Sequence, residues 1–163
     1  MTDKTLGLYI HFPFCQSKCP YCDFYSITDS SCADRYVNAV LLQMQDYAKA
    51  ASRHDVDSVF FGGGTPSMLS TKQLLKVIDG IYDNFNVCSD AEFTIEANPA
   101  TLKTSSLRKL RRAGINRLSI GLQSANDNEL RSLGRIHTYE DFEESYRMAR
   151  KAGFDNILSL IHI

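Results

Sequence analysis

The sequence predicts an α/β fold built on a parallel β-sheet. Three observations predict it: apolar runs typical of buried strands alternate with helical patterns, glycines end several of these segments, and unusual residues follow the strands. Strands that alternate with helices form parallel sheets through right-handed crossovers. In such sheets the functional residues lie at the carboxyl ends of the strands, so we expect one shared site at that edge.

The expected strands are short apolar runs over residues 6–12, 56–61, 92–98 and 116–123, with a fifth that begins near 154. The expected helices carry apolar residues at helical spacing, over about 34–51, 71–82, 105–113, 127–133 and 139–152. Ser70 or Thr71 is a suitable N-cap for the second helix, and Gly114 is a suitable C-cap for the third. The order of elements is therefore β-α-β-α-β-α-β-α-β, with two helical stretches in the last connection.

The number of these units leaves two architectures open. Four and a half β/α units fall short of the eight in a full barrel of ~250 residues, whereas a doubly wound sheet can close with five strands. The last six residues read LSLIHI, which is what a common sequencing-library adapter encodes in one frame. We therefore expect residues 1–157 to be native and residues 158–163 to be a non-native tail.

Composition argues against several functional classes. The chain is 44% hydrophobic and 23% charged with a formal net charge of −1, so it lacks the clustered cations of a nucleic-acid-binding protein. No apolar run approaches the ~20 residues of a membrane span, and residues 1–4 do not start a secretory signal. The cysteine count of five is odd, which favours a reducing, cytoplasmic compartment where clustered thiols indicate a metal or catalysis.

The most informative motif directly follows the first predicted strand. Cys15, Cys19 and Cys22 have the spacing C-x3-C-x2-C, and Phe24 stands where a fourth cysteine could be. Close thiolates repel each other unless a metal binds them, and tetrahedral zinc prefers four ligands, usually as two C-x2-C pairs. Iron–sulfur clusters commonly bind four cysteines, so three leave one iron open to a substrate or cofactor. A structural zinc site completed by His11 is the alternative.

This motif resembles the signature of the radical S-adenosylmethionine (SAM) superfamily, in which an aromatic residue, here Tyr21, precedes the last cysteine. In that superfamily three thiolates hold a [4Fe-4S] cluster, and the amino and carboxylate groups of SAM chelate the fourth iron. One electron from the cluster cleaves the sulfonium to give methionine and a 5′-deoxyadenosyl radical. The resemblance implies a partial (β/α)6 TIM-like barrel, of which this chain is the N-terminal part, truncated after about four β/α units.

A branch of the superfamily is indicated by five blocks: LYIHFPFCQSKCPYCDFYS, FFGGGTPSML, EANPATL, GINRLSIGLQS and LGRIH. They resemble the oxygen-independent coproporphyrinogen III oxidase-like branch, and most of all its haem chaperone subgroup. The dehydrogenases of this branch read C-x3-C-x2-C-x-C, so Phe24 favours the chaperones. The resemblance implies that haem is bound and passed to an acceptor, and that flavodoxin or ferredoxin donates electrons. Coproporphyrinogen III dehydrogenation in porphyrin biosynthesis is the alternative.

The resemblance also implies the site residues. Cys15, Cys19 and Cys22 match the cluster ligands, whereas the isolated Cys32 and Cys88 match none. The residues that match the SAM-binding site are Tyr9, Tyr21, Gly63, Gly64, Thr65, Glu96, Gln123 and Arg135. Family members usually carry an acidic residue near position 160, which falls within the suspected tail.

Several of these residues also have a physical rationale. Gly63 and Gly64 let the backbone approach a ligand without a Cβ clash, and in the family this turn, with Thr65, meets the SAM amino group. Glu96 can accept hydrogen bonds from a ribose hydroxyl pair, and Arg135 can pair with a carboxylate. The structural alternatives are a tight turn for the glycines and a surface salt bridge for Glu96. For Tyr9, the alternative is a core aromatic residue in a strand.

Overall fold

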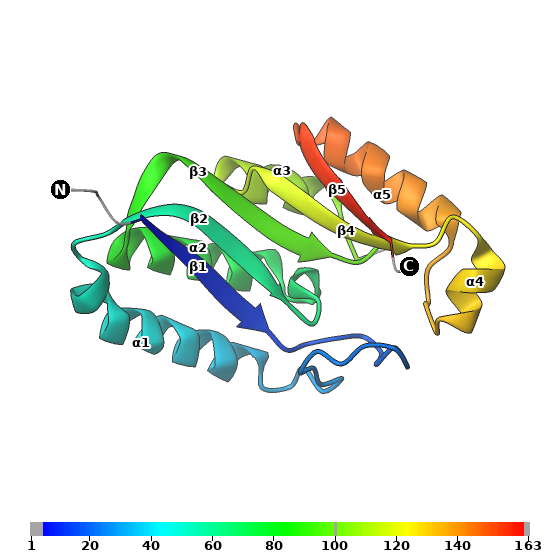
Figure 1. The fold of residues 1–163 in the computed structure, drawn as a ribbon, viewed down its shortest axis with the longest axis horizontal. Helices are drawn as coiled ribbons and strands as arrows, with labels where there is room; N and C mark the ends of the chain where they lie inside the picture. Colours follow the sequence, from blue (N-terminus) through cyan, green and yellow to red (C-terminus); the bar gives the residue numbers. More distant parts are fainter. Residues whose placement is uncertain (1–4, 100, 162–163) are drawn as a thin grey trace.

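A single parallel sheet with the strand order β1-β2-β3-β4-β5 organises the computed structural model, which describes residues 5–99 and 101–161 (Figure 1). The strands are β1 (Thr5–Phe12), β2 (Asp55–Gly63), β3 (Asn86–Ala97), β4 (Arg117–Gln123) and β5 (Asn156–Ile161). The helices are α1 (Ala33–Ala51), α2 (Thr71–Asn84), α3 (Thr104–Arg112), α4 (Asp127–Ser132) and α5 (Tyr139–Lys151), with a 3-10 turn η1 (Pro66–Met68).

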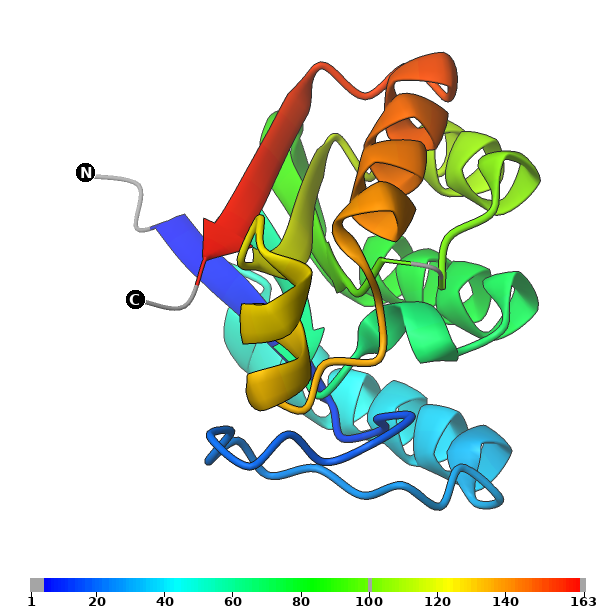
Figure 2. The same ribbon diagram turned by 90° about the vertical axis from the view of Figure 1, so that its right-hand side faces the viewer.

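The strand order confirms the partial barrel that the resemblance implies and excludes the doubly wound sheet that the number of β/α units also allowed. Each strand pairs with its predecessor in the chain, so the sheet grows in one direction only. Because parallel crossovers are right-handed, such growth places successive helices on the same face. Figure 2 shows α1, α2, α3 and α5 on one side of the curved sheet and its other face without helices. A doubly wound sheet would carry helices on both faces, so the fold is a partial barrel.

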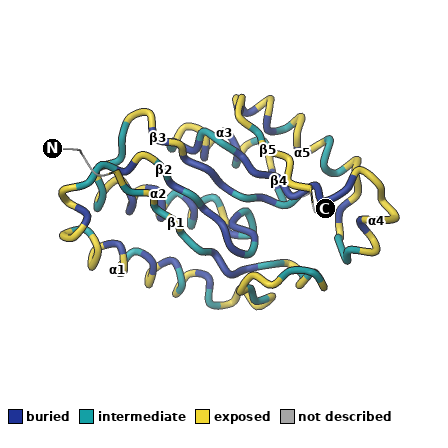
Figure 3. The backbone as a smooth tube through the Cα atoms, in the orientation of Figure 1, coloured by how far each residue is buried: buried dark blue, intermediate teal, exposed yellow. Residues whose placement is uncertain are grey.

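The hydrophobic core lies between the sheet and these helices. Alternate residues of the strands point into it, including Phe61 on β2, Ile95 on β3 and Leu118 on β4, all fully buried. The helices meet them with apolar stripes that contain Val77 and Ile81 on α2. Figure 3 shows the resulting band of buried backbone along the central strands, with exposed residues on the outer turns of the helices.

The helix-free face carries a different set of side chains. The ring of Tyr9 on β1 stacks on Phe60 of β2, with ring centroids 6.0 Å apart. Further along the same face, Glu92 on β3 forms a salt bridge of 2.9 Å with Arg117 on β4. This face is the inner face of the partial barrel, and it extends to the carboxyl ends of the strands.

The observed elements differ from the predicted ones mainly in β3. The strand begins at Asn86, well before residue 92, because Asn86 and Val87 pair with Asp55 and Val56 across a register shift in the ladder. Pairing with a neighbouring strand thus overrides the weak strand propensity of this segment. The expected N-cap is confirmed, since Ser70 forms a capping box with Gln73 at the start of α2.

The suspected non-native tail stays a prediction. Residues 156–161 form β5 and pair with β4, so that Leu160 lies opposite Gly121. Backbone pairing of this kind forms with either a native or a foreign sequence. Residues 162–163 of the suspected tail lie outside the described residues.

Candidate functional site

The segment that carries the three cysteines connects β1 to α1 and folds back on itself. The backbone N–H of Cys15 donates to the carbonyl of Ile27 at 2.9 Å, and the N–H of Ile27 donates to Pro13 at 2.7 Å. The N–H of Cys22 donates to the carbonyl of Cys19 at 3.0 Å, which closes a tight turn between these two thiols. The motif is therefore held as a compact loop at the carboxyl end of β1.

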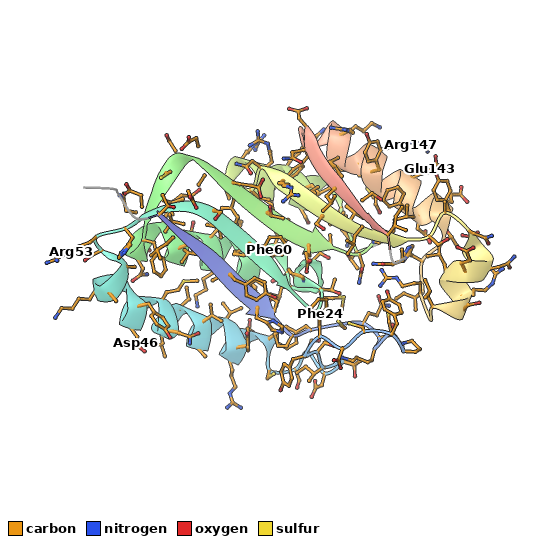
Figure 4. The ribbon with its side chains drawn as sticks, viewed as in Figure 1. Phe24, Asp46, Arg53, Phe60, Glu143 and Arg147 are labelled. Atoms are coloured by element: carbon orange, nitrogen blue, oxygen red, sulfur yellow. The ribbon has the colours of Figure 1, made fainter. Side chains whose placement is uncertain are left out.

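A lysine within the motif braces this loop. Lys18 Nζ donates to the carbonyl of Phe24 at 2.5 Å and to Ser26 Oγ at 3.0 Å. These bonds connect the segment between the first two cysteines to the segment after the third. The Phe24 side chain is 66% exposed, and Figure 4 shows it on the cysteine loop beyond the tip of β1.

The glycine turn after β2 packs directly on the cysteine loop. The backbone N–H of Gly64 donates to Phe12 and that of Thr65 to Phe14, both at 2.8 Å. A Cβ on Gly64 would lie 2.8 Å from the Phe14 carbonyl and 3.0 Å from Cys15 Sγ. A side chain at position 64 is incompatible with these distances, so the glycine allows this close approach.

One cavity of about 550 Å3 unites the site at the carboxyl ends of the strands. The predicted site residues that line it are Cys15, Cys19, Tyr21, Cys22, Gly63, Gly64, Thr65, Glu96, Gln123 and Arg135. They come from the loops after β1, β2 and β4 and from the end of β3. The expectation that unusual residues after different strands converge is therefore confirmed.

Tyr9 does not line this cavity. Tyr9 is 57% exposed, and the residue belongs to the lining of a second cavity of about 510 Å3 between β1 and α1. Its hydroxyl lies 3.2 Å from Nδ1 of His11, whose ring contacts the glycine turn. Tyr9 is thus connected to the site through His11, and its role as a cofactor-binding residue stays a prediction.

Glu96 places a partly buried carboxylate opposite the glycine turn. Burial raises the pKa of Glu96, while the N–H of Gly63, which hydrogen-bonds to the carboxylate, and the nearby His11 act in the opposite direction. A Cβ on Gly62 would lie 3.0 Å from Glu96 Oε2, so the carboxylate rests against the turn. In its charged form this group is a bidentate acceptor that faces the cavity.

Arg135, from the segment after α4, reaches across the cavity to the cysteine loop. Its Nη1 lies 3.6 Å from Cys19 Sγ and 3.5 Å from the Tyr21 hydroxyl, and its Nη2 donates to Asn98 Oδ1 at 2.7 Å and to the Gly121 carbonyl at 3.1 Å. Its Nε is buried without a partner among the described residues. A buried donor without an acceptor is unfavourable, so this orphaned Nε fits a missing anionic ligand.

Gln123 ends β4 in a strained conformation. Its φ of 69° is the only left-handed value among the described non-glycine residues. The side chain is 8% exposed and lines the cavity. Left-handed backbone at a residue with a Cβ costs energy and persists where surrounding structure enforces it, typically at functional sites.

Several residues that line the cavity are not in the predicted set, and two of them, Lys18 and Asn98, form hydrogen bonds that organise the site. Asn98 follows Glu96 at the end of the third predicted strand, where polar residues are expected to face the site, and this position is the signal that could have identified it. Lys18 lies inside the cysteine motif, but lysines at such positions are usually solvated. Its contacts across the loop depend on how the chain folds back after Cys22.

The donor set of this cavity fits an iron–sulfur cluster. Cys15, Cys19 and Cys22 share the wall of one cavity, and thiolates are the ligands that iron–sulfur clusters require.

Comparisons with known proteins agree with this geometry. The family model described as the radical SAM superfamily matches residues 9–163. The chain is 42% identical to the heme chaperone HemW of Bacillus subtilis over 91% of this chain and 40% of the relative. It is 38% identical to HemW of Escherichia coli over 96% of this chain and 42% of that relative.

A solved structure gives the same answer for the fold. Coproporphyrinogen III oxidase (HemN) from Escherichia coli, a radical SAM enzyme, superposes with a TM-score of 0.89 at 31% identity, over 96% of this chain and 37% of that one. The chain spans about two fifths of the length of the curated relatives that it matches. The family match, the cysteine motif and the partial barrel agree, and the chain belongs to the radical SAM superfamily.

Proposed function

We propose that this chain binds a [4Fe-4S] cluster and SAM, and that it forms the N-terminal part of a cytoplasmic haem chaperone that binds haem and passes it to an acceptor. The observation that carries the cofactor proposal is the convergence of Cys15, Cys19 and Cys22 with Glu96 and Arg135 on one cavity. The haem proposal is supported by relatives named heme chaperones at 42% and 38% identity. Phe24, in place of a fourth cysteine, points the same way.

Each residue has a defined part in this proposal. The three cysteines hold the cluster, which when bound and reduced supplies one electron for cleavage of the SAM sulfonium. The turn at Gly63 and Gly64 offers backbone groups to the SAM amino group, because no side chain blocks the approach. Glu96 accepts hydrogen bonds from the ribose hydroxyls, and the guanidinium of Arg135 pairs with the SAM carboxylate.

A second candidate function is the oxidative decarboxylation of coproporphyrinogen III. It is favoured by the TM-score of 0.89 to the Escherichia coli coproporphyrinogen III oxidase. In both functions an electron donor such as flavodoxin or ferredoxin would reduce the cluster. Among the described residues, no helix is long and apolar enough to cross a membrane.

The cofactor proposal is tested by EPR on the longest natural chain that contains residues 1–157, reconstituted anaerobically with iron and sulfide. The reduced protein should show a [4Fe-4S]+ signal that changes when SAM is added. Cys19→Ala should lose the signal, whereas Cys88→Ala should keep it, because Cys88 lies on β3 outside the cavity. A protein that binds zinc and no iron would refute the proposal.

Haem transfer and coproporphyrinogen oxidation are then separated with the same full-length protein. A chaperone should bind haem stoichiometrically, pass it to an apo-acceptor and fail to rescue a strain that lacks coproporphyrinogen oxidation. Rescue of that strain, with carbon dioxide release from coproporphyrinogen III, would support the dehydrogenase instead.

A further inference from the structure

Asn98 links two of the three cysteines through a continuous chain of side-chain contacts. Its Nδ2 donates to Thr65 Oγ1 at 2.9 Å, and Thr65 Oγ1 lies 3.7 Å from Cys15 Sγ. On the other side, Arg135 Nη2 donates to Asn98 Oδ1 at 2.7 Å, and Arg135 Nη1 lies 3.6 Å from Cys19 Sγ. One amide at the end of β3 therefore contacts the two residues that reach the first and second thiols of the motif.

When Cys15 is a thiolate, the hydrogen bonds in this series of side chains can be donated in one direction only. Arg135 has donors and no acceptor, so its partner on Asn98 must be the amide oxygen, which leaves the amide NH2 for Thr65. Because Asn98 donates to Thr65 Oγ1, the single hydroxyl proton of Thr65 remains free to point toward Cys15. A thiolate at Cys15 can only accept, so this proton is the one that the sulfur requires.

The amide of Asn98 can both donate and accept a hydrogen bond, whereas the carboxylate of an aspartate at this position could only accept. A carboxylate at this position would accept from both neighbours and draw the Thr65 hydroxyl proton away from Cys15. It would also place a negative charge beside Arg135 and offset the positive charge near Cys19. The change from asparagine to aspartate preserves shape, so these consequences arise without a change in volume.

We propose that Asn98 is a positioning residue that directs the Thr65 hydroxyl to Cys15 and the Arg135 guanidinium to Cys19, and that it thereby raises the reduction potential of the cluster. This inference rests on the proposed cluster site. Hydrogen bonds and positive charge at the ligand sulfurs stabilise the reduced, more negative state of an iron–sulfur cluster. Residues that orient the ligands without touching the metal are a general means of tuning such sites.

The backbone at this position is anchored independently of the side chain. The Asn98 carbonyl accepts from Thr101 Oγ1 at 2.6 Å and from the Thr101 N–H at 3.3 Å. Thr101 in turn contacts Ser67 Oγ at 2.7 Å. A substitution of the amide therefore leaves the local turn in place, and Thr101 supplies a matched control next to the same residue.

The test is the midpoint potential of the cluster in the anaerobically reconstituted protein, measured by EPR-monitored redox titration. Asn98→Asp should lower it by an amount equivalent to a tenfold change in the equilibrium constant of one-electron reduction, which is about 59 mV. Thr65→Val, which removes only the hydroxyl at Cys15, should shift it in the same direction by less. Thr101→Val should leave the potential unchanged, although it disturbs a hydrogen bond to the same residue.

Each outcome decides between a positioning and a merely structural role. An unchanged potential in Asn98→Asp, or an equal shift in Thr101→Val, overturns the inference, because packing alone would alter the melting temperature and not the potential. If Asn98→Asp loads no cluster, Thr65→Val carries the test, and a wild-type potential in it overturns the inference. A wild-type protein that forms no cluster refutes the proposed function itself, and with it this inference.

Discussion

The backbone of Gly63 lies against the imidazole of His11, so that a Cβ on Gly63 would lie 2.7 Å from the ring. The ring is held in this place because its Nε2 donates to the Tyr25 carbonyl at 2.9 Å. Gly63 also has a φ of +110°, which residues with a side chain rarely adopt. Through the His11 ring, the end of β2 is connected to the start of the cysteine loop, next to His11, and to its end at Tyr25.

Gly63→Ala should therefore destabilise the protein by about 1–3 kcal/mol through backbone strain, with a further loss from the clash with the ring. Gly153→Ala is the matched control, since Gly153 has a φ of +93° but nothing within 4 Å of its Cβ position. Urea denaturation of both variants separates the two contributions. Equal losses in the two variants would show that the His11 contact is unimportant.

Gln123 should reverse the usual ranking of alanine and glycine. Its φ of 69° costs about 1–2 kcal/mol for any residue with a Cβ, and alanine retains that cost while glycine does not. We expect Gln123→Gly to be more stable than Gln123→Ala by about 1 kcal/mol, after the higher entropy of unfolded glycine is included. Urea denaturation measures the difference, and a more stable alanine variant would contradict strain at this position.

Stability should depend on pH through Glu96. Burial raises the pKa of Glu96 above its ordinary value of 4.5, so the folded chain retains this proton to a higher pH than the unfolded chain. Folding stability from this group therefore falls as pH rises from about 4.5 through the raised pKa. Glu96→Gln should remove this loss and gain stability relative to wild type at pH 7 but not at pH 4. A constant difference between wild type and variant across this range would refute the prediction.

The opposite dependence is expected at His137, which follows Arg135 closely. Burial lowers the pKa of His137 below its ordinary value of 6.5, as does Arg135, while Asp141 and Asp127 oppose them. Its Nε2 donates to the Leu122 carbonyl at 3.1 Å. As the pH falls, His137 is protonated at a higher pH in the unfolded chain than in the folded chain. The free energy of unfolding therefore decreases as the pH falls through 6.5.

His137→Asn offers an amide donor at this position but cannot titrate. Its unfolding free energy should change less than that of wild type between pH 7.5 and about 5.5, the range just around the ordinary histidine pKa. Denaturant titrations at several pH values measure this slope. Identical slopes would assign the acid sensitivity to other groups.

Much of the site could be predicted because its signals are local. Cys15, Cys19 and Cys22 lie within eight residues, so their spacing alone brings the thiols together. The glycine turn directly follows a strand, and parallel strands end at one edge of the sheet, so its convergence with the cysteines followed from the order of elements. The alternation of strands and helices likewise predicted an α/β fold.

The sequence by itself determined the superfamily, the parallel sheet and the cysteine loop, since each depends on neighbouring residues and on the period of the pattern. Only the tertiary structure decided that Tyr9 lies outside the cavity and that β3 begins at Asn86. It also decided that Arg135 meets Cys19 across 116 residues, with Asn98 between Arg135 and Thr65. The physical reason is that spacing along a chain specifies which edge of a sheet a residue reaches, whereas side-chain partners depend on strand register, loop path and the direction of each hydrogen bond.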